Sequence, residues 1–110
     1  MADKIEQMEF IETPTFTRLV TDLLTDDEYR ELQNILVADP DRGDLIKGGG
    51  GIRKLRHAVQ GRGKSGGVRA IYYWMKEEHQ IYMLVVYPKS VKDNLTDKEV
   101  AILRDLVKEL

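Results

Sequence analysis

The chain has no cysteine and no long hydrophobic run, and only 7% of its residues are aromatic. Without cysteine it can form no disulfide, thiolate metal site or cysteine nucleophile, which fits a reducing compartment. No stretch approaches the roughly 18 apolar residues of a membrane span. The acidic start MADKIEQMEF also lacks the apolar segment of a signal peptide. We therefore expect a cytoplasmic protein without a membrane segment.

Metal-binding and cofactor-binding patterns are also scarce. The chain has 2 histidines, His57 and His79, with no pair at metal-ligand spacing. No two acids lie among apolar residues as a tuned acid/base couple. The run Gly48–Gly51 lacks the Gly-Lys-Ser/Thr ending of a phosphate-binding loop and does not open a helix. We expect no metal and no cofactor, and 110 residues with 42% hydrophobic content predict a single domain over residues 1–110.

Positive charge is concentrated in one stretch of a mildly acidic chain. The net charge is -2, yet residues 42–69 carry eight basic side chains and one acid, whereas residues 1–41 carry eleven acids and three basic residues. A basic patch held on a sheet within an acidic domain is suited to a polyanion at one place. The alternative is a solvated surface hairpin, and charge alone does not separate the two.

Hydrophobic periodicity predicts the order β-α-α-β-β-β-α, an α+β fold with a small antiparallel-rich sheet packed on helices. Thr13 is expected to cap a helix that begins at Pro14. Capping boxes are expected at Thr25 and Thr96. In such a box the threonine side chain accepts from the backbone N–H of a glutamate three residues on, and the glutamate side chain accepts from the threonine N–H. The strands are predicted at 6–11, 52–59, 68–75 and 81–87, the last as the central strand, with a loop over 43–51.

The basic residues of the predicted sheet form a candidate site. Alternation places Lys54 and Arg56 on one strand face and His57 on the opposite face, which favours a structural or surface role for His57. Arg69 lies across the hairpin, and Lys89 follows the last strand. Such cations could bind a phosphate and stabilise the charge that develops when a phosphodiester is attacked. RNA supplies its own 2′-hydroxyl nucleophile, so this chemistry needs no His, Cys or metal. A binding patch without catalysis is the alternative.

Four segments carry a resemblance to a known family. They are the Asp39-Pro40 to Gly43-Asp44 turn, the stretch Gly51-Ile52-Arg53-Lys54-Leu55-Arg56, the Gly-rich tip and strand from Gly61 to Tyr73, and the strand end Val86-Tyr87-Pro88-Lys89. Together they resemble the RelE/ParE superfamily of bacterial toxins, and they are most similar to its HigB-type branch.

The resemblance implies a ribosome-dependent mRNA endonuclease that works without a metal, by attack of the 2′-hydroxyl on the phosphodiester. Its expected partners are the ribosome, mRNA and a cognate HigA-like antitoxin with a helix-turn-helix domain. Arg69 matches the arginine that contacts the scissile phosphate. The expected catalytic residues are Lys54, Arg56, Arg69 and Lys89. The expected RNA and ribosome contacts are Arg53, Arg62, Lys64 and Tyr87.

One departure from the family pattern bears on this assignment. No aromatic residue follows Lys89, where RelE has a residue that stacks on the substrate base. Tyr87 or Tyr73 could substitute, although a core role is favoured for both. The competing hypothesis is a ParE-like inhibitor that binds DNA gyrase without catalysis, but the retained basic residues favour the nuclease. A plain RNA-binding module is disfavoured because few aromatics interleave with the basic residues. We also expect the Arg69 charge to lie at the surface.

Overall fold

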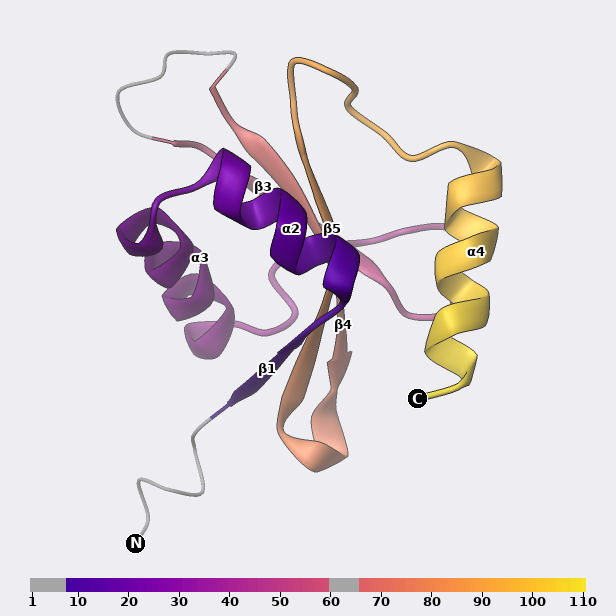
Figure 1. Cartoon of the computed structure of the whole chain (residues 1–110). Coiled ribbons are helices and arrows are strands. Elements are labelled where there is room, and N and C mark those ends of the chain that lie inside the picture. Colours follow the sequence, from indigo (N-terminus) through magenta and orange to yellow (C-terminus); the bar gives the residue numbers. More distant parts are fainter. Residues whose placement is uncertain (1–7, 60–65) are drawn as a thin grey trace, which may run out of the picture.

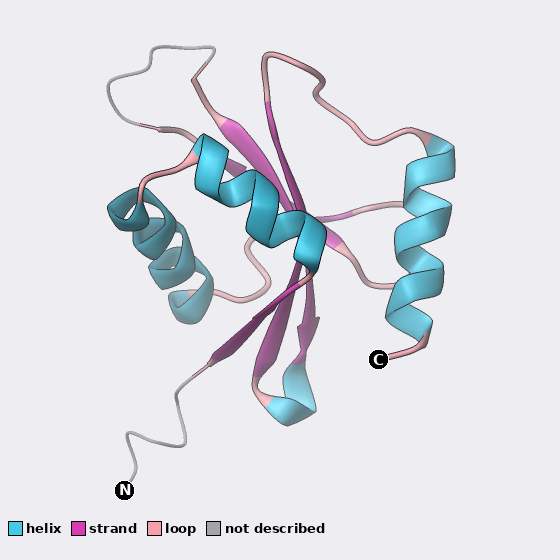
Figure 2. Ribbon diagram, in the orientation of Figure 1, coloured by secondary structure: helices cyan, strands magenta, loops and turns pink. Residues whose placement is uncertain are grey.

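The structure, a computed structural model, describes residues 8–59 and 66–110. Strands and helices follow each other in a mixed α+β order, as the sequence predicts (Figures 1 and 2). The elements are β1 (Glu9–Glu12), α2 (Pro14–Leu23), α3 (Asp26–Ala38), β2 (Asp44–Leu45), β3 (Arg53–His57), β4 (Val68–Met75), the 3₁₀ turn η1 (Lys76–Glu78), β5 (Gln80–Pro88) and α4 (Asp97–Lys108).

The helix starts are fixed by side-chain caps that the sequence predicts. Thr13 accepts a hydrogen bond from the Phe16 N–H at 3.0 Å, and Pro14 occupies the first turn of α2. Complete capping boxes begin α3 at Thr25 and α4 at Thr96. Each box satisfies two backbone N–H groups that have no partner inside the helix.

The strands form one five-stranded sheet in the order β1-β5-β4-β3-β2. Strands β3, β4 and β5 form the expected antiparallel meander, and β1 adds to β5 in parallel. The register of the β3–β4 pair sets Arg56 directly opposite Arg69. A register shift between Ile71 and Tyr72 interrupts the β4–β5 ladder.

Two apolar cores lie on opposite faces of this sheet. The first, under α2 and α3, includes Phe16, Leu32 and Tyr72. The second, under α4, includes Tyr87 and Val107. Figure 1 shows α2 and α3 on one side of the strands and α4 on the other. Each strand face is therefore identified by the helix that covers it.

Several predicted boundaries differ from the structure. Part of the expected loop 43–51 is the two-residue strand β2, which is too short to give a periodic signal. The predicted first strand at 6–11 appears as Glu9–Glu12, and residues 6 and 7 lie outside the described part. The central strand is β4 rather than the strand at 81–87, because β1 and β2 extend the sheet at opposite edges. These two edge additions come from distant parts of the chain.

The last helix packs less tightly than its apolar stripe predicts. Val107 is buried, but Leu106 is 39% exposed and Leu110 is 44% exposed. Both belong to a stripe at helical spacing that predicts burial, and this prediction is wrong for them; the stripe is Val100, Leu103, Leu106, Val107 and Leu110. No helix in the described residues is long and apolar enough to cross a bilayer.

A candidate anion site on the sheet

Lys54, Arg56 and Arg69, here called the basic cluster, lie on the face of the sheet that α4 covers. Arg56 and Arg69 are register partners, and Lys54 pairs with Ile71 of the core under α4. Because side chains alternate along a strand, Lys54 and Arg56 point to the same face. Lys54 and Arg69 are buried, at 9% and 6% exposure, whereas the Arg56 side chain is 57% exposed. The expectation that the charge of Arg69 lies at the surface is therefore wrong.

Arg69 is held by a carboxylate from the segment between β5 and α4. Its Nε and Nη2 lie 3.0 Å and 2.8 Å from the same oxygen, Oδ1 of Asp93. Hydrogen bonding from this guanidinium lowers the pKa of Asp93, and the charges of Lys54 and Arg56 act in the same direction. Asp93 is therefore a carboxylate at neutral pH, and it neutralises the buried Arg69.

The other two cations of the basic cluster are also bound within the chain. The Lys54 ammonium donates to the side-chain oxygen of Asn94 and, at 3.3 Å, to the backbone carbonyl of Asp93. Arg56 Nη1 lies 3.0 Å from Oδ2 of Asp44, an exposed pair at the edge of the sheet. Asp93, Asn94 and Asp44 are partners that the sequence pattern did not predict. Asp93, an acid four residues beyond Lys89, was the one sequence signal for a partner of the basic cluster. Strand alternation does not predict that the connecting segment folds back over the sheet.

Tyr87 sits beside Arg69 in the β4–β5 ladder but is part of the core. It is 6% exposed, and its hydroxyl donates to the Asp93 carbonyl at 3.4 Å. The Lys92 ammonium lies 5.1 Å from the centre of its ring, and burial raises the pKa of the phenol. Tyr73 is half-buried against the same core. The core role favoured for both tyrosines is confirmed, and an RNA contact by Tyr87 stays a prediction.

Lys89 follows β5, two residues beyond Tyr87, the register partner of Arg69. Lys89 is exposed just beyond β5, where its backbone N–H donates to the Gly67 carbonyl at 2.9 Å. It therefore lies at the end of the hairpin formed by β4 and β5. Arg62 and Lys64 fall outside the described residues, so their expected ribosome contacts stay predictions.

Arg53 belongs to the same basic run but lies on the other face of the sheet. Its register partner is Tyr72, in the core under α2 and α3. Arg53 Nη1 donates to the carbonyls of Asp41 and Gly43 at 3.1 Å and 2.8 Å. The Tyr72 hydroxyl supports the same turn by donating to the Pro40 carbonyl at 2.7 Å. Arg53 thus braces the turn after α3, and its expected RNA contact stays a prediction.

His57 faces α3, opposite the basic cluster, as alternation predicts. It is 6% exposed, and its Nε2 has no hydrogen-bond partner. That nitrogen lies 3.7 Å from Glu31 Oε1, in a hollow of about 240 Å³ that Asp27 and Glu28 also line. Burial lowers the pKa of His57, while Glu31 and Glu28 oppose the shift. No imidazole therefore contributes to the basic cluster from β3.

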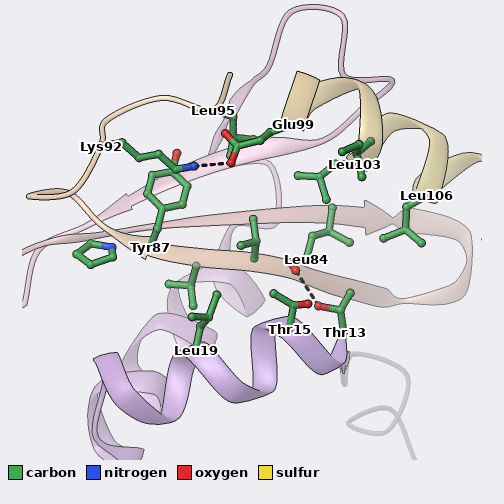
Figure 3. A pocket seen from close by; sticks show the side chains of 14 residues that line it. Thr13, Thr15, Leu19, Leu84, Tyr87, Lys92, Leu95, Glu99, Leu103 and Leu106 are labelled. Atoms are coloured by element: carbon green, nitrogen blue, oxygen red, sulfur yellow. Dashed lines mark hydrogen bonds and ion pairs between the residues drawn. The ribbon is translucent and has the colours of Figure 1, made fainter. Parts of the chain in front are cut away.

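A larger, apolar groove of about 440 Å³ runs between α2, β5 and α4 (Figure 3). Leu19, Leu84 and Leu103 line it, one from each element. At its ends, the Thr13 hydroxyl donates to the Leu84 carbonyl at 2.7 Å and Lys92 pairs with Glu99 at 2.6 Å (Figure 3). Among residues 8–59 and 66–110, no group of three or more His, Asp or Glu side chains is arranged to hold a metal ion.

The comparison with known families identifies the class of protein. The family described as RelE toxin of the RelE / RelB toxin-antitoxin system matches residues 11–110. The chain therefore belongs to the RelE toxin family, and the predicted RelE/ParE resemblance is confirmed.

Two solved structures share the fold. A free-state arginine-to-alanine double mutant of the E. coli toxin RelE superposes with a TM-score of 0.58 at 13% identity, covering 94% of this chain and 97% of that one. RelE in the archaeal RelE-RelB complex from Pyrococcus horikoshii OT3 gives a TM-score of 0.51 at 19% identity, covering 77% and 98%. These likenesses confirm the α+β fold.

Proposed function

We propose that this toxin is a ribosome-dependent mRNA endonuclease that cuts RNA by attack of a 2′-hydroxyl on the adjacent phosphodiester. The observation that carries the proposal is the basic cluster, in which strand register gathers Lys54, Arg56 and Arg69 on one sheet face. Three cations at one place on a chain of net charge -2 are suited to a phosphate. Membership of the RelE toxin family supports the same function.

In this reaction the 2′-oxygen forms a bond to phosphorus as the bond to the 5′-oxygen breaks. The 2′-hydroxyl loses its proton to a base and the 5′-oxygen gains one, so the products are a 2′,3′-cyclic phosphate and a 5′-hydroxyl. Negative charge builds on the phosphoryl oxygens during the attack. Arg69 and Lys54 would stabilise that charge, because fixed cations in a partly buried site interact more strongly than they do in water. Exposed Arg56 and Lys89 would bind neighbouring phosphates.

The proposed partners are the ribosome, mRNA and a cognate antitoxin. The antitoxin follows from the family, whose description pairs the toxin with RelB, and from the archaeal RelE, which was solved as a RelE-RelB complex. The finer proposal of a HigB-type toxin with a HigA-like helix-turn-helix antitoxin rests on the sequence resemblance. Arg62 and Lys64 would contact ribosomal RNA from the hairpin tip, and Arg53 and Tyr87 are the remaining proposed contacts.

The experiment is to express the chain and map transcript 5′ ends, with and without an inhibitor that clears ribosomes from mRNA. New 5′ ends inside translated regions that disappear with the inhibitor are the expected result. Plasmid supercoiling and gyrase-linked DNA breaks are measured in the same cultures. Intact transcripts together with gyrase-linked breaks would replace the nuclease by a ParE-like gyrase inhibitor.

A further inference from the structure

The edge of Arg69 that would hold a phosphate is already occupied by the chain itself. Nε and Nη2 form one edge of the guanidinium; Nε donates to Oδ1 of Asp93 at 3.0 Å, and Nη2 lies 2.8 Å from the same oxygen. Two neighbouring N–H groups on such an edge can bind a carboxylate or a phosphate as a fork. The Arg69 side chain is only 8% exposed, whereas the Asp93 side chain is 58% exposed. Asp93 therefore lies between the buried cation and solvent.

Asp93 and its neighbour Asn94 also accept hydrogen bonds from the polar groups next to Arg69. Lys54 on β3 donates to the Asn94 side chain and to the Asp93 carbonyl, and Tyr87 on β5 donates to that carbonyl as well. With Arg69 on β4, each strand of the meander contributes one donor to the Asp93–Asn94 pair. The pair thus covers the buried part of the candidate site at three points.

We propose that Asp93 is an internal stand-in for the RNA phosphate, and that substrate binds by exchanging a phosphate for the Asp93 carboxylate on Arg69. This inference rests on the proposed function and adds a closed state to it. A carboxylate and a phosphodiester present similar oxygens to a guanidinium, so one replaces the other without leaving the arginine unpaired.

The exchange requires only the exposed Asp93–Asn94 turn to open. Residues 89–96 contain no helix or strand, and Asp93 and Asn94 are both exposed. The segment is anchored on either side of this turn, because Lys92 pairs with Glu99 and Leu95 packs against the core under α4. Local opening is easiest where buried contacts are few, as they are at the turn itself. The Arg56–Asp44 pair is a different case, because both side chains are more than half exposed at 57% and 68%. Solvent screens that pair, so it does not close the site.

The test uses the whole chain and a single-stranded 2′-O-methyl RNA oligonucleotide, which lacks the attacking hydroxyl and cannot be cleaved. Asp93→Asn removes the competing charge at constant size. Asp105→Asn is the matched control, because it removes one acid from an exposed position on α4. We expect Asp93→Asn to bind about fivefold tighter than the wild type, the upper end of what releasing a partly exposed ion pair contributes. Binding by Asp93→Asn that is no tighter than that of Asp105→Asn overturns the proposal.

Stability gives an independent readout, because Asp93→Asn leaves a buried arginine without its counter-ion. Inorganic phosphate should raise the melting temperature of Asp93→Asn more than that of the wild type or Asp105→Asn, since the anion replaces the lost carboxylate. Equal phosphate effects on all three proteins would contradict the exchange. If Asp93→Asn does not fold even with phosphate, Asn94→Ala tests the closure. It frees Lys54 and should tighten oligonucleotide binding, and unchanged or weaker binding overturns the proposal.

The two proposals fail in different ways. If the wild-type protein leaves translated mRNA intact, the proposed nuclease function fails, whatever the oligonucleotide binding shows. If the wild type cleaves mRNA but Asp93→Asn gains neither affinity nor a phosphate response, only the exchange fails. The double variant Asp93→Asn/Arg69→Lys tests whether the gain in oligonucleotide affinity depends on Arg69. It should lose most of that gain, because lysine replaces the guanidinium fork by a point charge.

Discussion

Arg56 and Arg69 face each other as register partners across β3 and β4. Like charges directly opposite on a sheet are destabilising. The pair persists because each arginine has its own acid, Asp44 for Arg56 and Asp93 for Arg69. Two opposed arginines, each compensated by its own acid, break a rule of sheet stability, and such breaks are typical of functional sites.

Arg56 offers the cleanest mutational test, since its side chain is 57% exposed. Arg56→Ala should change the free energy of unfolding by about 0.5 kcal/mol or less, as surface substitutions usually do. It should nevertheless weaken toxicity, because a phosphate contact is lost. Arg30→Ala on α3 is the matched control, an exposed arginine on the helix that covers the other sheet face. Growth curves and thermal melts of both variants check this, and equal toxicity of the two would remove Arg56 from the site.

Arg69→Ala should lose both stability and activity. Truncating a buried side chain is expected to destabilise the fold by roughly 1–3 kcal/mol. The cleavage rate should fall on the order of 10²–10³-fold, as when one well-placed oxyanion stabiliser is removed. Arg69→Lys separates the two effects, because it keeps the charge and pairs with Asp93 but cannot form the fork. We expect it to recover more stability than activity in melts and cleavage assays. Full recovery of cleavage would mean that only the charge of Arg69 matters.

Burial of His57 should make the protein less stable on mild acidification. Burial lowers the pKa of its imidazole below the ordinary 6.5, and Glu31 and Glu28 only partly oppose this. The unfolded chain therefore binds the proton more readily. The contribution of His57 is complete above its unfolded pKa and is lost as the pH falls from there through the lower pKa of the folded state. Denaturant melts at pH 7.5 and 5.5 should show this loss.

Two variants assign that pH dependence to His57. The loss between pH 7.5 and 5.5 should be smaller in His57→Gln, which has no titrating group at the position. His79→Asn should behave like the wild type, since His79 is exposed in a turn at φ 54, a conformation that asparagine tolerates. The same slope in His57→Gln as in the wild type would assign the effect to other groups.

Ribosome binding should weaken steeply as salt rises, because lysine and arginine contacts to phosphates release counter-ions. Removing one such contact, by Arg62→Ala or Lys64→Ala, should reduce the slope of log affinity against log salt by about 1. Co-sedimentation with ribosomes between low and moderate salt measures the slope. A flat salt response would contradict an electrostatic mode of binding.

Strand periodicity predicted much of the candidate site. Alternation and hairpin pairing place Lys54, Arg56 and Arg69 on one face and His57 on the other, and the structure agrees. These relationships are local, because they depend only on residue spacing and on the pairing of neighbouring strands.

The remaining features depend on tertiary contacts that no local pattern encodes. The contact between Lys54 and Asn94 spans 40 residues, and the one between Arg69 and Asp93 spans 24. Arg53 likewise makes contacts that local pattern does not predict. It belongs to the basic run, yet its guanidinium supports the turn at Asp41 and Gly43 on the other face.

The central claim is that the basic cluster cuts translated mRNA. It is tested most directly by mapping transcript 5′ ends after expression of the wild type and of Arg56→Ala, with Arg30→Ala as the control. We predict new 5′ ends within translated regions for the wild type and Arg30→Ala, and clearly fewer of them for Arg56→Ala at equal protein level. Intact transcripts with the wild type, or equal cleavage by all three proteins, would contradict the account.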